Sequence, residues 1–121
     1  MAVVLSAGPV ALRISGSGDD WASVTLEAPG ISLRLGADTH SIVLRRLLEG
    51  LSSGLPADSK LEGLITFFED HFTIFRGERD GQRVLVFQDA DGQHRYQFCL
   101  EDRVLAAWLE TLEHEVNKKT A

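Results

Sequence analysis

The sequence predicts an α+β fold, in which antiparallel β-sheets are covered by two helices and the elements run strands, helix, strands, helix. Three observations predict it. The first third of the chain alternates apolar and polar side chains with period 2, which is typical of strands that bury one face. Two later segments repeat their apolar residues at helical spacing. Between those segments, Asp80-Gly81 and Asp91-Gly92 supply the φ > 0 positions of tight hairpins.

The alternation predicts three early strands within residues 3–35, and Val3 to Leu5 form a candidate fourth. The apolar sets expected to face the core are Val10/Leu12/Ile14, Ala22/Val24/Leu26 and Ile31/Leu33/Leu35. Turn residues separate the strands at Gly8-Pro9, at residues 16–20 and at Pro29-Gly30. Because successive side chains of a strand point to opposite faces, a polar set is expected together on the other face. Its members are Arg13, Trp21, Thr25, Ser32 and Arg34.

A helix is expected from about residue 39 to residue 51. Its apolar residues are Leu44, Leu47, Leu48 and Leu51, and Asp38 or Thr39 can cap its first turn. The pentapeptide Gly50-Leu51-Ser52-Ser53-Gly54 has the Gly-x-Ser-x-Gly spelling of a hydrolase nucleophile turn, which requires a preceding strand. Since a helix precedes it here, we interpret it as the end of that helix, followed by a loop over 51–60.

Meander strands are expected over residues 62–100. Residues 61–68 fit either a helical face or a strand, and strand is favoured by the composition of 65–68. The clearer strands cover 72–76, 83–88 and 94–100. Val84 to Phe87 are apolar on both faces, which predicts a central strand covered on both sides. Cys99 is interpreted as a small buried side chain of the last strand.

The clearest helical pattern spans about residues 102–117. Its apolar stripe consists of Leu105, Trp108, Leu109, Leu112 and Val116. Acidic residues precede the segment and Lys118 and Lys119 follow it, so that each sign matches the helix macrodipole. No linker separates these segments, and we expect one domain over residues 1–121.

The composition places the chain among ordinary globular domains, since 121 residues with 44% hydrophobic side chains can bury one core. No apolar run approaches the roughly 18 residues of a membrane span. The N-terminus lacks the basic start of a signal peptide. Cys99 alone permits no intramolecular disulfide, so we expect a reducing compartment and a cytoplasmic location.

The net charge is −6, and residues 61–121 carry 12 Asp or Glu against 7 Lys or Arg. This acidity disfavours phosphate backbones and anionic membranes and favours a basic partner. Charges on turns can steer such a partner. The carboxylates expected to contact it are Glu69, Asp70, Glu78, Asp80, Asp89 and Asp91.

No catalytic residue, metal site or cofactor site is indicated. The four histidines lack the paired spacing of metal ligands. The segment Asp89-Ala90-Asp91-Gly92 matches only the opening of a calcium loop, and we interpret it as a hairpin turn.

The polar face of the early strands offers an alternative binding surface, formed by Arg13, Trp21, Thr25 and Arg34. Trp and Arg are enriched at binding hot spots. Packing of Trp21 beneath a helix or the later strands is the competing interpretation, because large aromatic residues are mostly buried.

The element order of this chain resembles the layout of Whirly-type single-stranded nucleic-acid-binding proteins and of the related SsgA-like sporulation and cell-division regulators. This resemblance covers most of the chain and implies nucleic-acid binding by base stacking on the Trp21, Arg13 and Arg34 face. In size, acidity and lack of a catalytic signature, the chain is also similar to small acidic bacterial immunity proteins, which neutralise a cognate toxin by covering it.

These observations lead us to expect a non-enzymatic protein–protein interaction module of the bacterial cytoplasm, of immunity or adaptor type, with a basic protein partner and no cofactor. The first alternative is a single-stranded nucleic-acid-binding or regulatory protein. The second is an enzyme whose active site is assembled from distant residues. A homodimer is left open, since strand edges and the last helix can both pair across a two-fold axis.

Overall fold

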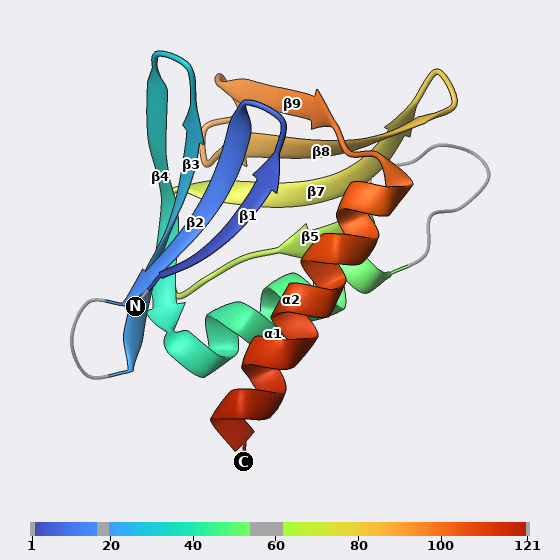
Figure 1. Cartoon of the computed structure of the whole chain (residues 1–121). Coiled ribbons are helices and arrows are strands. Elements are labelled where there is room, and N and C mark those ends of the chain that lie inside the picture. The colour runs from blue at the N-terminus through green and yellow to red at the C-terminus, as the bar shows by residue number, and fades with distance from the viewer. Residues whose placement is uncertain (1, 17–19, 54–61, 121) are drawn as a thin grey trace.

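The early strands form the first antiparallel sheet of the structure, a computed structural model that describes residues 2–16, 20–53 and 62–120. Its strands are β1 (Ala2–Ala7), β2 (Val10–Gly16), β3 (Trp21–Ala28), β4 (Ile31–Thr39) and β6 (Glu69–Asp70), hydrogen-bonded in that order (Figure 1). The predicted early strands are confirmed, including the candidate fourth at the N-terminus. β4 continues beyond the expected end at residue 35, and the short strand β6 was not predicted.

The second sheet holds the predicted meander. Its strands are β5 (Glu62–Ile65), β7 (Phe72–Arg79), β8 (Gln82–Asp89) and β9 (Arg95–Cys99), in that order across the sheet. The preference for strand within 61–68 is confirmed for Glu62–Ile65, which form β5, whereas residues 66–68 lie in no strand. Asp80, Gly81 and Gly92 all have positive φ, as expected for the two hairpin turns. Val84 to Phe87 are all buried in β8, which lies between β7 and β9, so the predicted central strand is confirmed.

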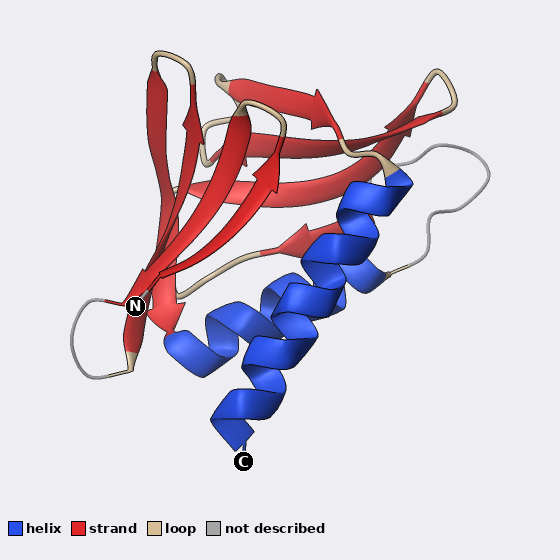
Figure 2. Cartoon of the chain, viewed as in Figure 1, coloured by secondary structure: helices blue, strands red, loops and turns tan. Residues whose placement is uncertain are grey.

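Two helices complete the α+β fold, in the predicted order of strands, helix, strands and helix. They are α1 (His40–Ser52) and α2 (Asp102–Thr120), and Figure 2 shows them crossing on the same side of the molecule, below the sheets. One apolar core joins both helices to both sheets. In the described part of the chain, no helix is long and apolar enough to cross a membrane.

Trp108 connects α2 to both sheets. Its side chain is buried, its Nε1 donates a hydrogen bond to the Ser6 carbonyl of β1 at 2.8 Å, and its ring centroid lies 6.4 Å from that of Phe98 in β9. The stripe of α2 predicted from helical spacing therefore faces the core as expected, with Leu105 and Leu112 also buried.

Three local predictions were wrong. Ile31 was expected in the core but is 42% exposed, because it directly follows the Pro29-Gly30 turn at the tip of the β3–β4 hairpin. Cys99 is exposed rather than buried. It alternates with Phe98, which packs against the core, and its Sγ lies 3.2 Å from the Gln82 Oε1 that accepts its hydrogen bond.

The third wrong prediction is that Asp38 or Thr39 caps the start of α1. Thr39 is the residue that precedes the helix, but no side chain caps its first turn. The Asp38 carboxylate is instead engaged by Thr39 N and Phe68 N, each at 2.7 Å. At the other end, the Ser52 and Ser53 hydroxyls donate to the Glu49 carbonyl, so the serine pentapeptide is the helix end that was expected. Gly54, most of the expected loop 51–60 and the turn residues 17–19 lie outside the described residues.

Candidate functional site

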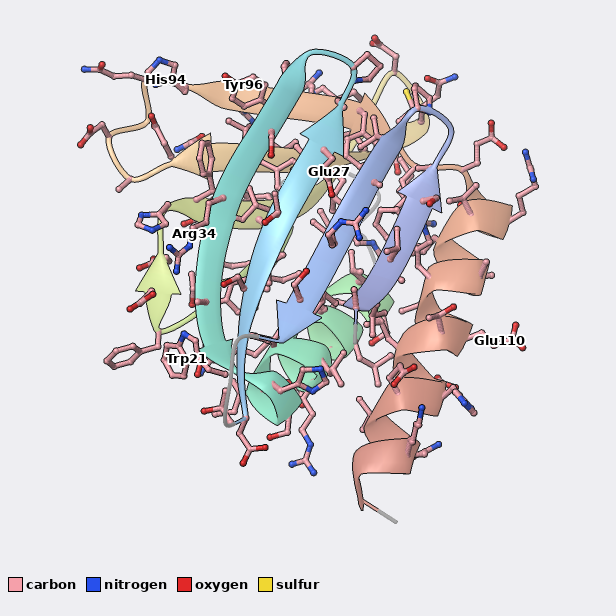
Figure 3. The ribbon with its side chains drawn as sticks, turned by 60° about the vertical axis from the view of Figure 1, so that its left-hand side comes forward. Trp21, Glu27, Arg34, His94, Tyr96 and Glu110 are labelled. Atoms are coloured by element: carbon pink, nitrogen blue, oxygen red, sulfur yellow. The ribbon has the colours of Figure 1, made fainter. Side chains whose placement is uncertain are left out.

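The outer face of the first sheet carries the predicted polar row. Arg13 lies opposite Thr25 in the β2–β3 register, and Thr25 lies opposite Arg34 in the β3–β4 register. The pairing is irregular between Val24 and Thr25: Thr25 lies opposite Arg34 and Val24 lies opposite Gly36, so that the buried Leu35 is an extra residue of β4. Ser32 is exposed on the same strand. Figure 3 views this face, with Arg34 and Glu27 on it.

Both arginines of the row are engaged by carboxylates. Arg13 donates to the Oε1 of Glu27, and the Nη2 of Arg34 lies 3.1 Å from the Oε2 of Glu69. Their side chains remain 44% and 54% exposed, so these are surface ion pairs. The two guanidinium charges are therefore locally balanced, which weakens any attraction of this face for phosphate groups.

Trp21 ends the outer face at the start of β3, opposite Thr39, and it is half-buried. Its ring makes an edge-to-face contact with Phe68, with 6.1 Å between the ring centroids. Phe68 is 78% exposed, which is unusual for so large an apolar side chain. The two rings thus form an exposed aromatic corner. The sequence pattern identified Trp21 but gave no signal for Phe68, which looked like an ordinary strand residue.

The segment that carries Phe68 and β6 is held to β4 by backbone and side-chain contacts. Gly36 lies opposite Asp70, and a Cβ on Gly36 would lie 2.4 Å from the Glu69 carbonyl oxygen, so only glycine fits. The buried Asp38 carboxylate accepts the Phe68 N–H. Glu69 and Asp70 are exposed on the outside of this junction.

The β8–β9 turn is closed by Asp89. One oxygen of its carboxylate accepts the backbone N–H of His94 at 3.2 Å, and the other lies 2.7 Å from His94 Nδ1. The hydrogen bond with the His94 ring holds the pKa of Asp89 below its usual value. Asp91 is exposed at the tip of the same turn.

Of the six carboxylates predicted to contact a partner, Glu69 and Asp70 form β6 of the first sheet, and the other four fall at the two ends of the second sheet. Glu78 and Asp80 lie at the β7–β8 hairpin, whereas Asp89 and Asp91 lie at the opposite end of β8. Phe72, two residues after Asp70, lies opposite Asp89, so β6 and the β8–β9 turn belong to the same end. We call this end the acidic rim. It consists of Trp21, Arg34, Phe68, Glu69, Asp70, Asp89 and Asp91.

Figure 3 shows the extent of the rim: Trp21, Arg34, Tyr96 and His94 follow one another along one edge of the molecule, while Glu110 of α2 lies at the opposite edge. The ring centroids of Phe72 and Tyr96 lie 6.3 Å apart and join β7 to β9 beneath this edge. The rim therefore combines carboxylates on rigid strands and a closed turn with an exposed aromatic corner.

Elsewhere, the described residues hold no group of three or more His, Cys, Asp or Glu side chains that could bind a metal ion. Arg76 is the one arginine that the structure shows in the core, at 4% exposure, and its Nη1 donates to the Leu51 carbonyl near the end of α1. Burial, aided by the charge of Arg83, lowers the pKa of Arg76. A cation at a helix C-terminus is favourable, so this contact stabilises the fold rather than forming a site.

Acidification is expected to weaken the β8–β9 turn. Because the folded pKa of Asp89 is depressed, the stabilisation from its carboxylate is present above the pKa of an unfolded carboxyl and is lost as the pH falls through the folded value. The measurement is an NMR titration of the Asp89 carboxyl carbon. In His94→Ala, the pKa of Asp89 should rise towards that of exposed carboxyls. An identical titration in the two proteins would contradict the assigned cause.

The fold and the rim define an α+β protein of two antiparallel sheets and two helices, with an acidic and aromatic surface at one end. Comparison with protein-family models, with functionally described proteins and with solved structures finds no match for the chain.

Proposed function

We propose that this protein is a protein-interaction module that binds a basic partner through the acidic rim. The observation that carries the proposal is the convergence at one end of Glu69, Asp70, Asp89 and Asp91 with the exposed ring of Phe68. Contiguous exposed apolar surface that is rimmed by polar residues marks interaction sites, and Phe68 adjoins the ring of Trp21. The carboxylates would steer a basic surface into contact, and the aromatic corner would anchor it.

The rigidity of the rim supports this proposal. Asp38, Gly36 and the closed Asp89 turn hold its backbone in place, so little conformational freedom is lost when a partner binds. The rim exposes Asp70 and Asp91 to solvent and to a partner, whereas Glu69 is engaged by Arg34 and Asp89 is engaged by His94. An arginine or lysine of the partner could compete for the Glu69 carboxylate.

Single-stranded nucleic acid is the second candidate, favoured by the aromatic corner alone, since bases stack on exposed aromatic rings. The ion pairs of Arg13 and Arg34 and the nearby carboxylates oppose it. Fluorescence anisotropy with labelled single-stranded DNA at low ionic strength separates the two candidates. Salt-sensitive binding of the DNA that is lost in Phe68→Ala would support nucleic-acid binding and contradict the proposed binding of a basic protein.

Charge reversal at the rim is expected to slow association with the partner by about tenfold at low salt, because long-range attraction sets the association rate. The variant is Asp70→Lys with Asp91→Lys, since both side chains are exposed. Asp89 is left intact because it closes its turn. The partner is first identified by cross-linked capture and mass spectrometry, and association is then measured by surface plasmon resonance over a salt series.

The matched control is Glu110→Lys with Glu113→Lys. Both residues are exposed on α2, so the net charge changes equally while the rim is untouched. Equal loss of association rate in both variants would indicate a bulk charge effect and would contradict a role for the rim.

A further inference from the structure

The two sheets have four outer edges, and three of them are short or partly covered in the described part of the chain. β1 has its Ser6 carbonyl occupied by Trp108 Nε1. β6 has only 2 residues and pairs with Gly36 and Ala37, so residues 31–34 of β4 have no strand on that side in the described part of the chain. β5 lies against α1 so closely that a Cβ on Gly63 would lie 2.7 Å from the Gly50 carbonyl oxygen. Short or covered edges are the usual devices that prevent unwanted strand pairing.

Within the described chain, β9 is the edge that is open along its whole length. It is the last strand in the order β5-β7-β8-β9, and among the described residues no strand or helix is hydrogen-bonded along its outer side. Figure 1 shows it at the outer border of the second sheet, with its length uncovered by either helix. Its 5 residues lack proline and glycine, so its backbone can accept a further strand.

The hydrogen-bond pattern of β9 shows which backbone groups face this open edge. Asp89 N donates to His94 O at 3.1 Å, and Leu100 N donates to Arg83 O at 2.9 Å. Residues of an antiparallel strand bond alternately to one side and the other. Tyr96 and Phe98 therefore bond to β8, while Arg95, Gln97 and Cys99 direct their N–H and C=O groups outward. The side chains of these last three residues are also exposed.

We propose that β9 pairs with β9 of a second copy of this chain, antiparallel and with the two-fold axis at Gln97. This register opposes Arg95 to Cys99 of the second copy and joins all the outward backbone groups of the two strands. It also brings Arg95 diagonally next to Glu101 of the second copy, within the range of cross-strand charge pairs. Glu101 lies two residues beyond Cys99, and its exposed carboxylate is engaged by Arg103 of its own chain at 3.0 Å, a surface ion pair that Arg95 can share. Arg95 begins β9 and Glu101 lies just beyond its end, so an antiparallel arrangement of two copies places opposite charges near each other.

Pairing of this kind extends the second sheet across the two copies, with an isologous interface. Because the strands are antiparallel, the two β8–β9 turns lie at opposite ends of the joined strands, and the dimer presents two acidic rims. This inference goes beyond the proposed function and does not depend on it. A dimer is measured without any partner, and the carboxylates of the rim are not altered in the test.

Sedimentation equilibrium of the purified full chain is expected to show a monomer–dimer equilibrium, which Gln97→Pro abolishes. Proline removes an N–H that faces the open edge and not the ladder with β8, so the fold should be retained, as judged by circular dichroism. Gln97→Thr keeps the N–H and the strand preference and should remain dimeric. A wild-type chain that stays monomeric over the concentration series, or a dimer that survives in folded Gln97→Pro, would overturn the proposal.

Cysteine cross-linking checks the register. In a Cys99→Ser background, Gln97→Cys places the two sulfurs across the two-fold axis, where directly opposed residues have Cα atoms about 5.5 Å apart and a disulfide fits. Gln93→Cys in the same background should not cross-link, since the two copies of residue 93 are far apart in this register. Cross-linking at residue 93 but not at residue 97 would exclude the proposed register.

A charge exchange provides the second check of the register. Arg95→Glu and Glu101→Arg should each weaken the dimer by about tenfold, since the symmetry makes each pair occur twice. The double variant with both substitutions should restore much of the affinity of the two copies for each other. Additive losses in the folded double variant would contradict the antiparallel arrangement.

Discussion

Trp108→Ala is expected to lower the free energy of unfolding by about 4 kcal/mol, the largest effect among the substitutions considered, because it leaves a large cavity in the core. Trp108 is 2% exposed and joins α2 to both sheets, through the hydrogen bond to Ser6 and the ring contact with Phe98. Urea denaturation followed by circular dichroism measures the change. The slope of the transition should stay the same if only stability is affected.

Trp108→Phe is the matched control. It keeps most of the apolar volume but removes the hydrogen bond of Nε1 to the Ser6 carbonyl, so a loss of about 1–2 kcal/mol is expected. If alanine and phenylalanine cost the same, the hydrogen bond rather than core packing would account for the whole effect, contrary to this interpretation.

Asp38→Ala is expected to cost about 3 kcal/mol, since it removes a buried carboxylate that accepts hydrogen bonds from two part-buried backbone donors. These donors are the N–H groups of Thr39 and Phe68, each 2.7 Å from a carboxylate oxygen. Loss of the second contact should also free the segment that carries Phe68 and β6. We expect a lower midpoint in urea and faster amide hydrogen exchange at Phe68.

Two controls separate this effect from a general change in charge. Asp38→Asn keeps one acceptor oxygen and should fall between the wild type and the alanine variant. Asp70→Ala removes an exposed carboxylate and should change stability by less than about 0.5 kcal/mol. A similar cost for Asp38→Ala and Asp70→Ala would show that Asp38 does not connect β4 to the Phe68 segment.

Most elements of the fold could be predicted from local patterns. The period-2 alternation located the early strands, the Asp-Gly dipeptides located both turns of the meander, and the leucine spacing located α1 within one residue at each end. β6 could not be predicted, because its 2 residues form a strand only through pairing with Gly36 and Ala37 of β4. Such pairing depends on contacts between distant residues, which periodicity does not report.

The candidate site was predicted less completely. Alternation correctly placed Arg13, Thr25 and Arg34 on one face. The prediction that all six carboxylates contact one partner, however, ignored where the turns lie in the meander. In a meander, successive turns lie at opposite ends of the shared strand, so Asp80 and Asp91 are separated by the length of β8. Phe68 was missed because its exposure results from the way the segment after β5 turns towards β4.

The sequence by itself determined the class of fold, the faces of the early strands, both helices and the hairpin turns, because each depends on residues close together along the chain. Only the tertiary structure decided that Glu27 and Glu69 engage the arginines, that Asp38 connects two segments rather than capping a helix, and that Cys99 and Phe68 face solvent. These features depend on the order of strands within each sheet and on the packing of one sheet against the other. That order brings together residues that are far apart in the sequence, which is why no local pattern contains it.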